Sequence, residues 1–129
     1  MKCVTCRGPA IIDIRRHNSN FCAEHFIEQC HRQVHKAIEE FSMFEKSDKI
    51  LVAVSGGKDS LAIWDLLLDL GYSVDGLYIG LGIGDYSDTS LDYARAYART
   101  RSLHLIEVDV PSTFGFDIPN GSRAAKRVP

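Results

Sequence analysis

The chain has 129 residues, of which 45% are hydrophobic, and its formal net charge at pH 7 is −2. This length supports one domain with a small appendage, and the hydrophobic fraction excludes a disordered chain. No apolar run is long enough to cross a membrane, and the N-terminus lacks the apolar core of a signal peptide. We therefore expect a cytoplasmic protein with no membrane association, whose four cysteines favour metal binding over disulfides.

Two pairs of metal-ligating residue types lie near the N-terminus. Cys3 and Cys6 form a CxxC, and after a gap of fifteen residues Cys22 and His25 form a CxxH. One pair on a tight turn and one at the start of a helix complete a tetrahedron with no open position. These ligands indicate structural zinc, with an iron–sulfur site or free thiols as the alternatives. Between the pairs, residues 10–14 predict a strand of a short hairpin that turns at residues 18–20.

From about Cys22 to Phe44 the pattern is helical. One apolar stripe runs along this segment and consists of Phe26, Ile27, Cys30, Val34, Ala37, Ile38, Phe41 and Phe44. We interpret Cys30 as a core residue, because a buried free cysteine behaves as a small hydrophobe. His31 and His35 stand four residues apart and could share a metal ion, but no third ligand is near, which favours a solvated helix face. We expect this helix to dock the zinc knuckle against the unit that follows.

Residues 48–70, DKILVAVSGGKDSLAIWDLLLDL, organise the rest of the chain. Residues 50–54 are all apolar and predict a strand buried on both faces, as in a parallel sheet. Leucines and a tryptophan recur at helical spacing over residues 61–68. The predicted order is therefore strand, glycine turn and helix.

The turn SGGKDS predicts a phosphate-binding loop. Gly56 and Gly57 have no Cβ, so the backbone can turn sharply and a ligand can come close. The unpaired amides of the first helical turn face outward with the positive end of the helix dipole behind them. Hydroxyl donors, an ammonium group and an oxygen ligand for Mg²⁺ accompany them, namely Ser55, Ser60, Lys58 and Asp59. The alternative, an ordinary strand–helix turn, leaves this crowding of polar residues unexplained.

Two more strands and a helix are expected after the loop helix, which Gly71 ends as a C-cap. The strands fall at residues 73–79 and 103–110, and the helix at residues 87–101. Glycines at every second position over residues 80–84 leave room for a flat ligand such as adenosine, although a loose loop explains them too. Ligands in open α/β sheets lie beyond the carboxyl ends of the strands, which favours the ligand interpretation.

The C-terminal residues 111–129 contain turn formers and no closing element. Three strands and two crossovers make only part of a doubly wound sheet, one edge of which would be unprotected. A basic cluster near the end fits RNA phosphates and a solvated tail equally well; it consists of Arg123, Lys126 and Arg127.

These motifs together resemble one family. SGGKDS matches the loop of the N-type ATP pyrophosphatases of the PP-loop superfamily, which split ATP to AMP and pyrophosphate to adenylate a substrate. The CxxC and CxxH pairs, the long helix, LVAVSGGKDSLA and LYIGLGIGDYS resemble the N-terminal portion of the tRNA 2-thiouridine synthetases of the TtuA/TtcA type. The TtuA branch is closer because it has the N-terminal zinc knuckle. Those enzymes are more than twice as long as this chain.

The resemblance implies an α/β fold in which the zinc knuckle and long helix, residues 1–47, precede part of a parallel, Rossmann-like sheet, residues 48–129. This sheet would be of the adenine nucleotide alpha hydrolase-like kind. The implied zinc ligands are Cys3, Cys6, Cys22 and His25. The implied ATP-phosphate site is Ser55, Gly56, Gly57, Lys58, Asp59 and Ser60, and we expect the catalytic roles on Lys58, Asp59 and Ser60. The backbone near Ala53 and Ile79 would meet the nucleoside.

The implied activity is ATP-dependent tRNA thiolation by a uridine 2-sulfurtransferase. The uridine C2 oxygen attacks the α-phosphate, pyrophosphate leaves into the loop, and a sulfur nucleophile displaces AMP. The implied cofactors and partners are Mg²⁺, Zn²⁺, tRNA, a ubiquitin-like sulfur carrier and a [4Fe–4S] cluster whose ligands lie outside this chain. We expect these residues alone to be inactive, and a homodimer stays open.

Two other functions stay open. The first is another adenylating synthetase of the PP-loop superfamily, of the amidotransferase or the lysidine-forming type, against which the zinc knuckle argues. The second is a non-catalytic, zinc-stabilised module that binds RNA or protein and carries a vestigial loop.

Overall fold

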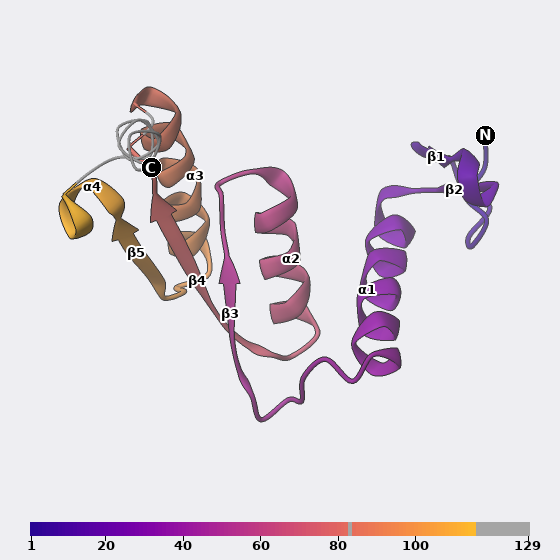
Figure 1. The fold of residues 1–129 in the computed structure, drawn as a ribbon. Helices are drawn as coiled ribbons and strands as arrows, with labels where there is room; N and C mark the ends of the chain where they lie inside the picture. Colours follow the sequence, from indigo (N-terminus) through magenta and orange to yellow (C-terminus); the bar gives the residue numbers. More distant parts are fainter. Residues whose placement is uncertain (83, 116–129) are drawn as a thin grey trace, which may run out of the picture. The chain divides into compact units, whose positions relative to one another are not determined.

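The computed structural model describes residues 1–82 and 84–115 of the chain (Figure 1). The chain divides into two compact units, Met1–Glu45 and Lys46–Pro129. The first unit contains β1 (Ile12–Ile14), the 3₁₀ turn η1 (Arg15–His17), β2 (Ser19–Phe21) and α1 (Ala23–Glu40). The second contains β3 (Lys49–Ala53), α2 (Lys58–Asp69), β4 (Ser73–Gly80), α3 (Gly84–Thr100), β5 (Leu105–Asp109) and α4 (Val110–Phe114).

The first unit contains a small antiparallel hairpin. Ile12 pairs with Phe21 and Ile14 with Ser19, which leaves η1 as the connection. The predicted turn at residues 18–20 is wrong, because Asn18 alone takes the left-handed conformation, at φ 48°, and the chain is in β2 from Ser19 onward. Asparagine tolerates this conformation better than most residues.

Helix α1 is shorter than its apolar pattern predicts. The helix ends at Glu40, and Ser42 takes a positive φ of 47°, so the four residues up to Phe44 are not helical. Along the predicted apolar stripe, Ile38 is buried and Cys30 is half-buried, whereas Phe41 is 67% exposed.

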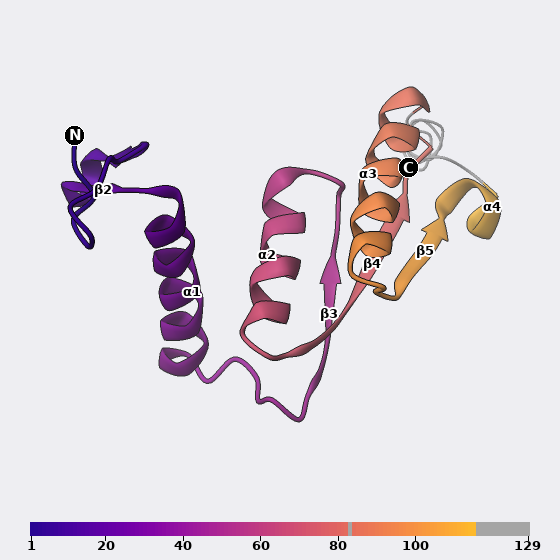
Figure 2. The same cartoon turned by 180° about the vertical axis from the view of Figure 1, so that it is seen from behind.

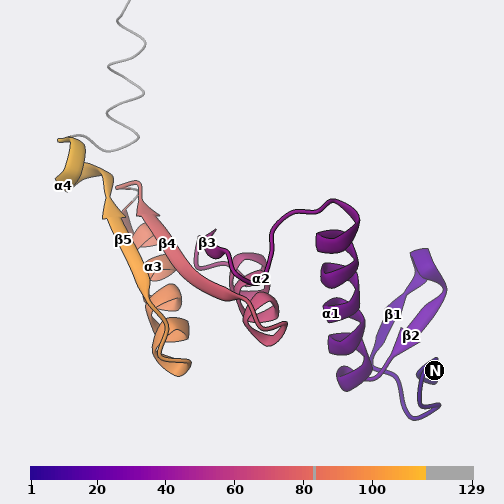
Figure 3. The same ribbon diagram turned by 90° about the horizontal axis from the view of Figure 1, so that it is seen from below.

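The second unit is a parallel sheet in the order β3-β4-β5, which confirms the predicted fold class. Both crossover helices, α2 and α3, lie on one side of this sheet (Figures 2 and 3). Burial alternates accordingly along β4, where Val74 and Tyr78 are buried and Ile79 is 46% exposed. Leu51 of β3 is 51% exposed on the uncovered face. The prediction that this strand is buried on both faces is therefore wrong for the part of the chain that the structure describes.

The core of the second unit forms around Trp64 of α2, which is fully buried. Its indole lies over Gly76 of β4, where an added Cβ would stand 2.5 Å from the ring. The indole N–H donates to the carbonyl oxygen of Val74 at 3.2 Å, and the Tyr97 ring of α3 lies 5.3 Å away between centroids. Gly76 thus provides the space that lets α2 approach the sheet.

Several boundaries differ from the expected ones by a few residues. The C-cap of α2 is Leu70, and the predicted capping glycine, Gly71, follows it with a φ of 92° and donates its amide to the carbonyl oxygen of Leu68. The short helix α4 was not predicted. Its N-cap is Asp109, whose carboxylate accepts the amide of Ser112 at 3.2 Å.

The basic cluster at residues 123–127 lies outside the described residues. None of the helices that the structure describes has the length and apolar character needed to cross a bilayer.

Candidate metal centre and phosphate-binding loop

The four predicted metal ligands of the first unit come together in space. The ligand atoms of Cys3, Cys6, Cys22 and His25 all lie within 4.8 Å of one another. The Cys22 Sγ is 3.1 Å and the Cys3 Sγ 3.6 Å from the His25 Nδ1, and the Sγ atoms of Cys6 and Cys22 are 4.0 Å apart. A tetrahedral zinc site with Zn–S bonds of about 2.3 Å has edges of about 3.8 Å, so this closed set fits zinc.

The turn that carries Cys3 and Cys6 shifts the pKa values of both thiols. Burial raises the pKa of the Cys3 thiol, but hydrogen bonds from the amides of Cys6, Cys22 and Thr5 outweigh burial and lower the pKa to about 6. For Cys6 the Gly8 amide lowers the pKa, but burial and the neighbouring thiols raise it above the usual value. The same turn therefore holds one thiol that ionises easily, Cys3, beside one that resists ionisation, Cys6.

A carboxylate supports the histidine of this set. The Glu28 Oε2 lies 3.9 Å from the His25 Nε2, one helical turn along α1, while the Nδ1 faces the cysteine sulfurs. A carboxylate this close to the second ring nitrogen is in position to orient a metal-ligating imidazole. Sequence reasoning missed Glu28, although its spacing of three residues from a ligand on a helix was a usable signal. Cys30, His31 and His35 take no part in the only such cluster found among the described residues.

The predicted phosphate loop of the second unit joins β3 to α2. Gly56 takes a φ of 79°, a conformation that L side chains rarely adopt. An added Cβ at Gly56 would also stand 2.2 Å from the carbonyl oxygen of Ser90 in α3. Gly57, by contrast, has a φ of −80° and serves as the N-cap of α2, which begins at Lys58. Of the two glycines, Gly56 is therefore the one that the backbone strictly requires.

The two hydroxyls of the motif hold the loop together. The Ser60 Oγ donates to the carbonyl oxygen of Gly57 at 3.1 Å and accepts the amide of Ser55 at 3.1 Å. The Ser55 Oγ accepts the amide of Gly57 at 3.3 Å. The structure gives the amides of Gly56, Lys58 and Asp59 no acceptor among the described residues. These amides, rather than the hydroxyls, are the open donors of the loop.

The charged side chains of the motif lie in solvent at the start of α2. The side chains of Lys58 and Asp59 are 90% and 94% exposed, and Lys58 Nζ donates to Asp59 Oδ1 at 3.2 Å. A contact this exposed contributes little to stability, so both groups can exchange it for a phosphate and a cation.

A hollow of about 300 Å³ adjoins the loop at the carboxyl ends of β3 and β4. Its lining is mostly apolar and consists of Ala53, Val54, Ser55, Leu77, Ile79 and Leu81. Both residues predicted to meet a nucleoside, Ala53 and Ile79, are among them. In parallel α/β sheets this is the edge at which ligands bind.

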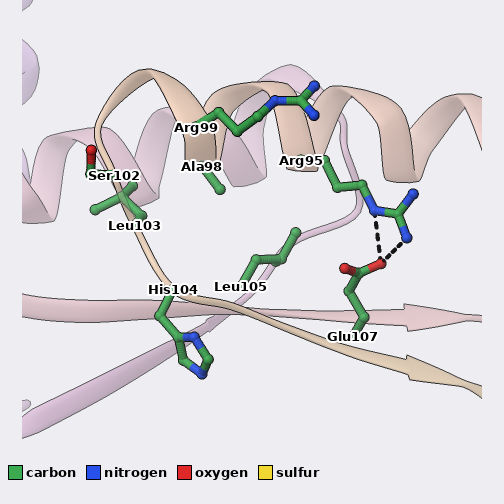
Figure 4. A pocket seen from close by; sticks show the side chains of 8 residues that line it. All are labelled: Arg95, Ala98, Arg99, Ser102, Leu103, His104, Leu105 and Glu107. Atoms are coloured by element: carbon green, nitrogen blue, oxygen red, sulfur yellow. Dashed lines mark hydrogen bonds and ion pairs between the residues drawn. The ribbon is translucent and has the colours of Figure 1, made fainter.

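A larger cavity of about 510 Å³ lies toward the opposite, amino end of the strands, between the end of α3 and the start of β5 (Figure 4). The guanidinium of Arg95 donates to the Glu107 carboxylate there at 2.5 and 2.9 Å. Because this cavity faces the amino end of β5, it lies away from the phosphate loop and adds no residue to the candidate site.

Comparison with known proteins adds independent evidence. Residues 2–27 match the family model described as 2-thiouridine synthetase TtuA, N-terminal LIM domain. The chain is 42% identical over 128 residues to a tRNA-5-methyluridine(54) 2-sulfurtransferase of Thermus thermophilus, covering 99% of this chain and 40% of that protein. A protein of the same description from Thermotoga maritima is 41% identical over 115 residues, covering 89% of this chain and 38% of that protein.

A solved structure shows the same fold. The U34-tRNA thiolase NcsA from Methanococcus maripaludis, with its [4Fe–4S] cluster, superimposes with a TM-score of 0.80 at 23% sequence identity. The match covers 98% of this chain and 47% of that chain. The chain thus spans about two-fifths of the length of the curated relatives above.

Proposed function

We propose that this chain carries the zinc and ATP-phosphate sites of an ATP-dependent tRNA sulfurtransferase of the TtuA/TtcA type. The premise is its similarity over nearly its whole length to tRNA-5-methyluridine(54) 2-sulfurtransferases and, over residues 2–27, to the N-terminal LIM domain of 2-thiouridine synthetase TtuA. The observation that carries this proposal is the loop at Gly56. Its open amides adjoin an apolar hollow at the carboxyl ends of β3 and β4. A nucleotide could place its phosphates on the former and its nucleoside in the latter.

Each residue of the motif then has a role. The amides of Gly56, Lys58 and Asp59, together with the Lys58 ammonium, receive the pyrophosphate. Asp59 offers an oxygen to the Mg²⁺ that accompanies ATP. The hydroxyls of Ser55 and Ser60 keep the loop in shape, which their internal hydrogen bonds support. Ala53 and Ile79 border the nucleoside.

The proposed chemistry has two displacements. The uridine C2 oxygen attacks the α-phosphorus of ATP, and the bond to the β-phosphate bridging oxygen breaks. Negative charge that builds on the departing pyrophosphate meets donors already in place, which is the catalytic contribution of the loop. A sulfur nucleophile then adds at C2, and the C2–O bond breaks as AMP leaves.

Other parts of the proposal concern the whole protein. Zinc at the four N-terminal ligands would be structural, because a closed set offers no position to a substrate. We further propose tRNA as the substrate, a ubiquitin-like carrier with a C-terminal thiocarboxylate as the sulfur donor, a cytoplasmic location, and a [4Fe–4S] cluster whose ligands lie outside this chain.

Exchange of labelled pyrophosphate into ATP by the full-length protein tests this function. We expect exchange that depends on tRNA and falls about 100-fold in Lys58→Ala, because a preorganised charge is lost from the leaving group. Lys49→Ala, which removes another exposed ammonium at the start of β3, should leave exchange unchanged. Exchange stimulated by a small acid or an amine without tRNA would favour a different adenylating synthetase. tRNA binding that survives Lys58→Ala, with no measurable ATP affinity, would favour the non-catalytic module.

A further inference from the structure

We propose that the tip of the β1–β2 hairpin, residues Arg15–His17, is a contact surface for the phosphodiester backbone of the RNA substrate. This inference rests on the proposed function for the identity of the polyanion. The location of the contact surface is inferred from the position of the positive charge and from the geometry of the tip.

Positive charge is concentrated in the segment that forms the hairpin and the metal ligands. Residues 1–22 contain four lysines or arginines against one aspartate, a formal charge of +3, whereas the rest of the chain has a formal charge of −5. The basic residues are Lys2, Arg7, Arg15 and Arg16. The small net charge of the whole chain therefore conceals a basic region near the N-terminus, and a basic region on an acidic protein attracts a polyanion.

The tip itself offers its cations to solvent. Arg15, Arg16 and His17 occupy the three positions of η1, and all three are exposed. The Arg15 side chain is 92% exposed, and its contact with Asp13 is 3.4 Å long. An exposed pair of this kind is weak and can be exchanged for a phosphate. Arg16 has no acidic partner among the described residues.

The backbone beneath these side chains is fixed. The amide of Asn18 donates to the carbonyl oxygen of Arg15 at 3.1 Å, and the Ser19 hydroxyl donates to the carbonyl oxygen of His17 at 3.0 Å. At the other end of the hairpin, Phe21 is buried and its ring lies 6.5 Å from that of Phe26. Cations held on such a support lose less conformational freedom on binding than cations on a mobile tail do.

The chemistry of the tip favours nucleic-acid phosphate over a membrane or an apolar protein surface. Residues 15–20 read RRHNSN, in which no side chain is apolar and all can donate hydrogen bonds. Arginine matches phosphate oxygens with two parallel N–H donors, and serine and asparagine are frequent phosphate contacts as well. An anchor in a membrane would need an apolar side chain at this position.

Salt-dependent tRNA binding by the full-length protein tests the proposal. The test variant is Arg15→Ala/Arg16→Ala, and the control is Arg32→Ala/Lys36→Ala on α1, which removes the same charge from the same unit. We expect the slope of log K against log salt to fall by about 2 in the test variant, with about 10-fold or more weaker binding at low salt. The control should change neither. Arg15→Lys/Arg16→Lys should retain the slope and part of the affinity.

The outcomes separate this inference from the function on which it rests. If the wild-type protein binds tRNA and both double-alanine variants bind it equally well, the tip is not the contact surface, while the proposed function stands. An equal loss in both variants would indicate net charge alone and would also overturn the inference. If the wild-type protein does not bind tRNA at all, both proposals fail. Zinc content and circular dichroism of each variant exclude unfolding as the cause of a loss.

Discussion

The carbonyl oxygen of Ser90 in α3 lies so near Gly56 that a Cβ added to Gly56 would stand 2.2 Å from it. The phosphate loop is thus shaped from two sides, by its own positive φ and by a helix that follows β4 in the chain. A loop wedged in this way can keep its amides pointed outward before any ligand arrives, which is what preorganised binding requires.

Gly56→Ala should therefore be far more harmful than Gly57→Ala. A left-handed backbone and a clash with backbone atoms together should cost about 2–4 kcal/mol of unfolding free energy and abolish stabilisation by pyrophosphate. At Gly57 the new Cβ would meet only the Ser55 hydroxyl, at 3.3 Å, and φ is ordinary, so we expect a cost of about 1 kcal/mol or less. Urea denaturation with and without pyrophosphate measures both effects. Equal losses in the two variants would contradict the role of Ser90.

Ser60→Ala should loosen the loop in the absence of any ligand. The Ser60 hydroxyl is the acceptor for the Ser55 amide, so its removal leaves this amide to exchange with solvent. We expect hydrogen exchange at Ser55 to speed up about 5-fold, since a hydrogen bond contributes about 1 kcal/mol. Ser60→Thr keeps the hydroxyl and should keep the slow exchange. If exchange in the free protein is the same in Ser60→Ala and the wild type, the hydroxyl serves only the ligand.

Much of this arrangement could be predicted from the sequence, because it depends on local patterns. The CxxC and CxxH pairs, the strand–turn–helix around SGGKDS and the glycine that follows α2, Gly71, are each contained within a few residues. The family resemblance and the α/β fold are confirmed. Local chemistry also gave the members of the loop, but the binding roles assigned to them stay predictions.

Several of the errors come from contacts between distant residues. The apolar run Ile50–Val54 does not reveal which face of β3 a helix will cover, and the structure covers only one. Neither the contact between Ser90 and Gly56 nor the indole over Gly76 follows from periodicity, because both depend on how closely α3 and α2 approach neighbouring segments. The sequence also predicts the Ser55 and Ser60 hydroxyls as donors to a phosphate, whereas in the structure both make hydrogen bonds within the loop.

Cys3→Ser should remove the metal and unfold the first unit. We expect about one equivalent of zinc per chain in the wild type and none in the variant, with a loss of helicity that reflects α1, because structural zinc supplies folding free energy. Cys30→Ser is the matched control, since Cys30 lies outside the four-ligand set. Elemental analysis with circular dichroism measures both quantities. Iron in place of zinc, or a folded sample without metal, would refute the assignment.

Glu28→Gln tests the support of the histidine ligand. The carboxylate at 3.9 Å from the His25 Nε2 should help to hold the imidazole in position. Loss of the negative charge should weaken zinc binding about 10-fold, as changes to such outer partners commonly do. Competition with a chromophoric chelator measures the affinity. Glu24→Gln, in the first turn of the same helix, is the control, and an equal effect there would point to helix-end electrostatics instead.

Gly76→Ala should disrupt the core of the second unit. The new Cβ would stand 2.5 Å from the buried Trp64 ring, so the indole or the strand must shift, at a cost of about 1–3 kcal/mol. In a Trp64→Phe background, where the ring is smaller, the same change should cost distinctly less. A double-mutant cycle from urea denaturation gives the coupling between the two sites. Additive free energies would show that the glycine is needed for some reason other than the indole.

The contact between Tyr97 and Asp65 should make stability depend on alkaline pH. Burial and the hydrogen bond to the Asp65 carboxylate, at 2.5 Å, raise the pKa of Tyr97 from 10.0 to about 12. Because the folded state favours the protonated phenol, this contribution is fully present below pH 10 and is lost as the pH rises from 10 to 12. Tyr97 is only partly buried and Arg101 also contacts Asp65, so solvent screening limits the effect to about 1–2 kcal/mol. Tyr97→Phe keeps the ring beside Trp64 but has no proton to lose. Urea denaturation of both proteins at several pH values gives their free energies of unfolding. The wild type should lose stability relative to Tyr97→Phe between pH 10 and 12, and a difference that does not change with pH would contradict the assignment.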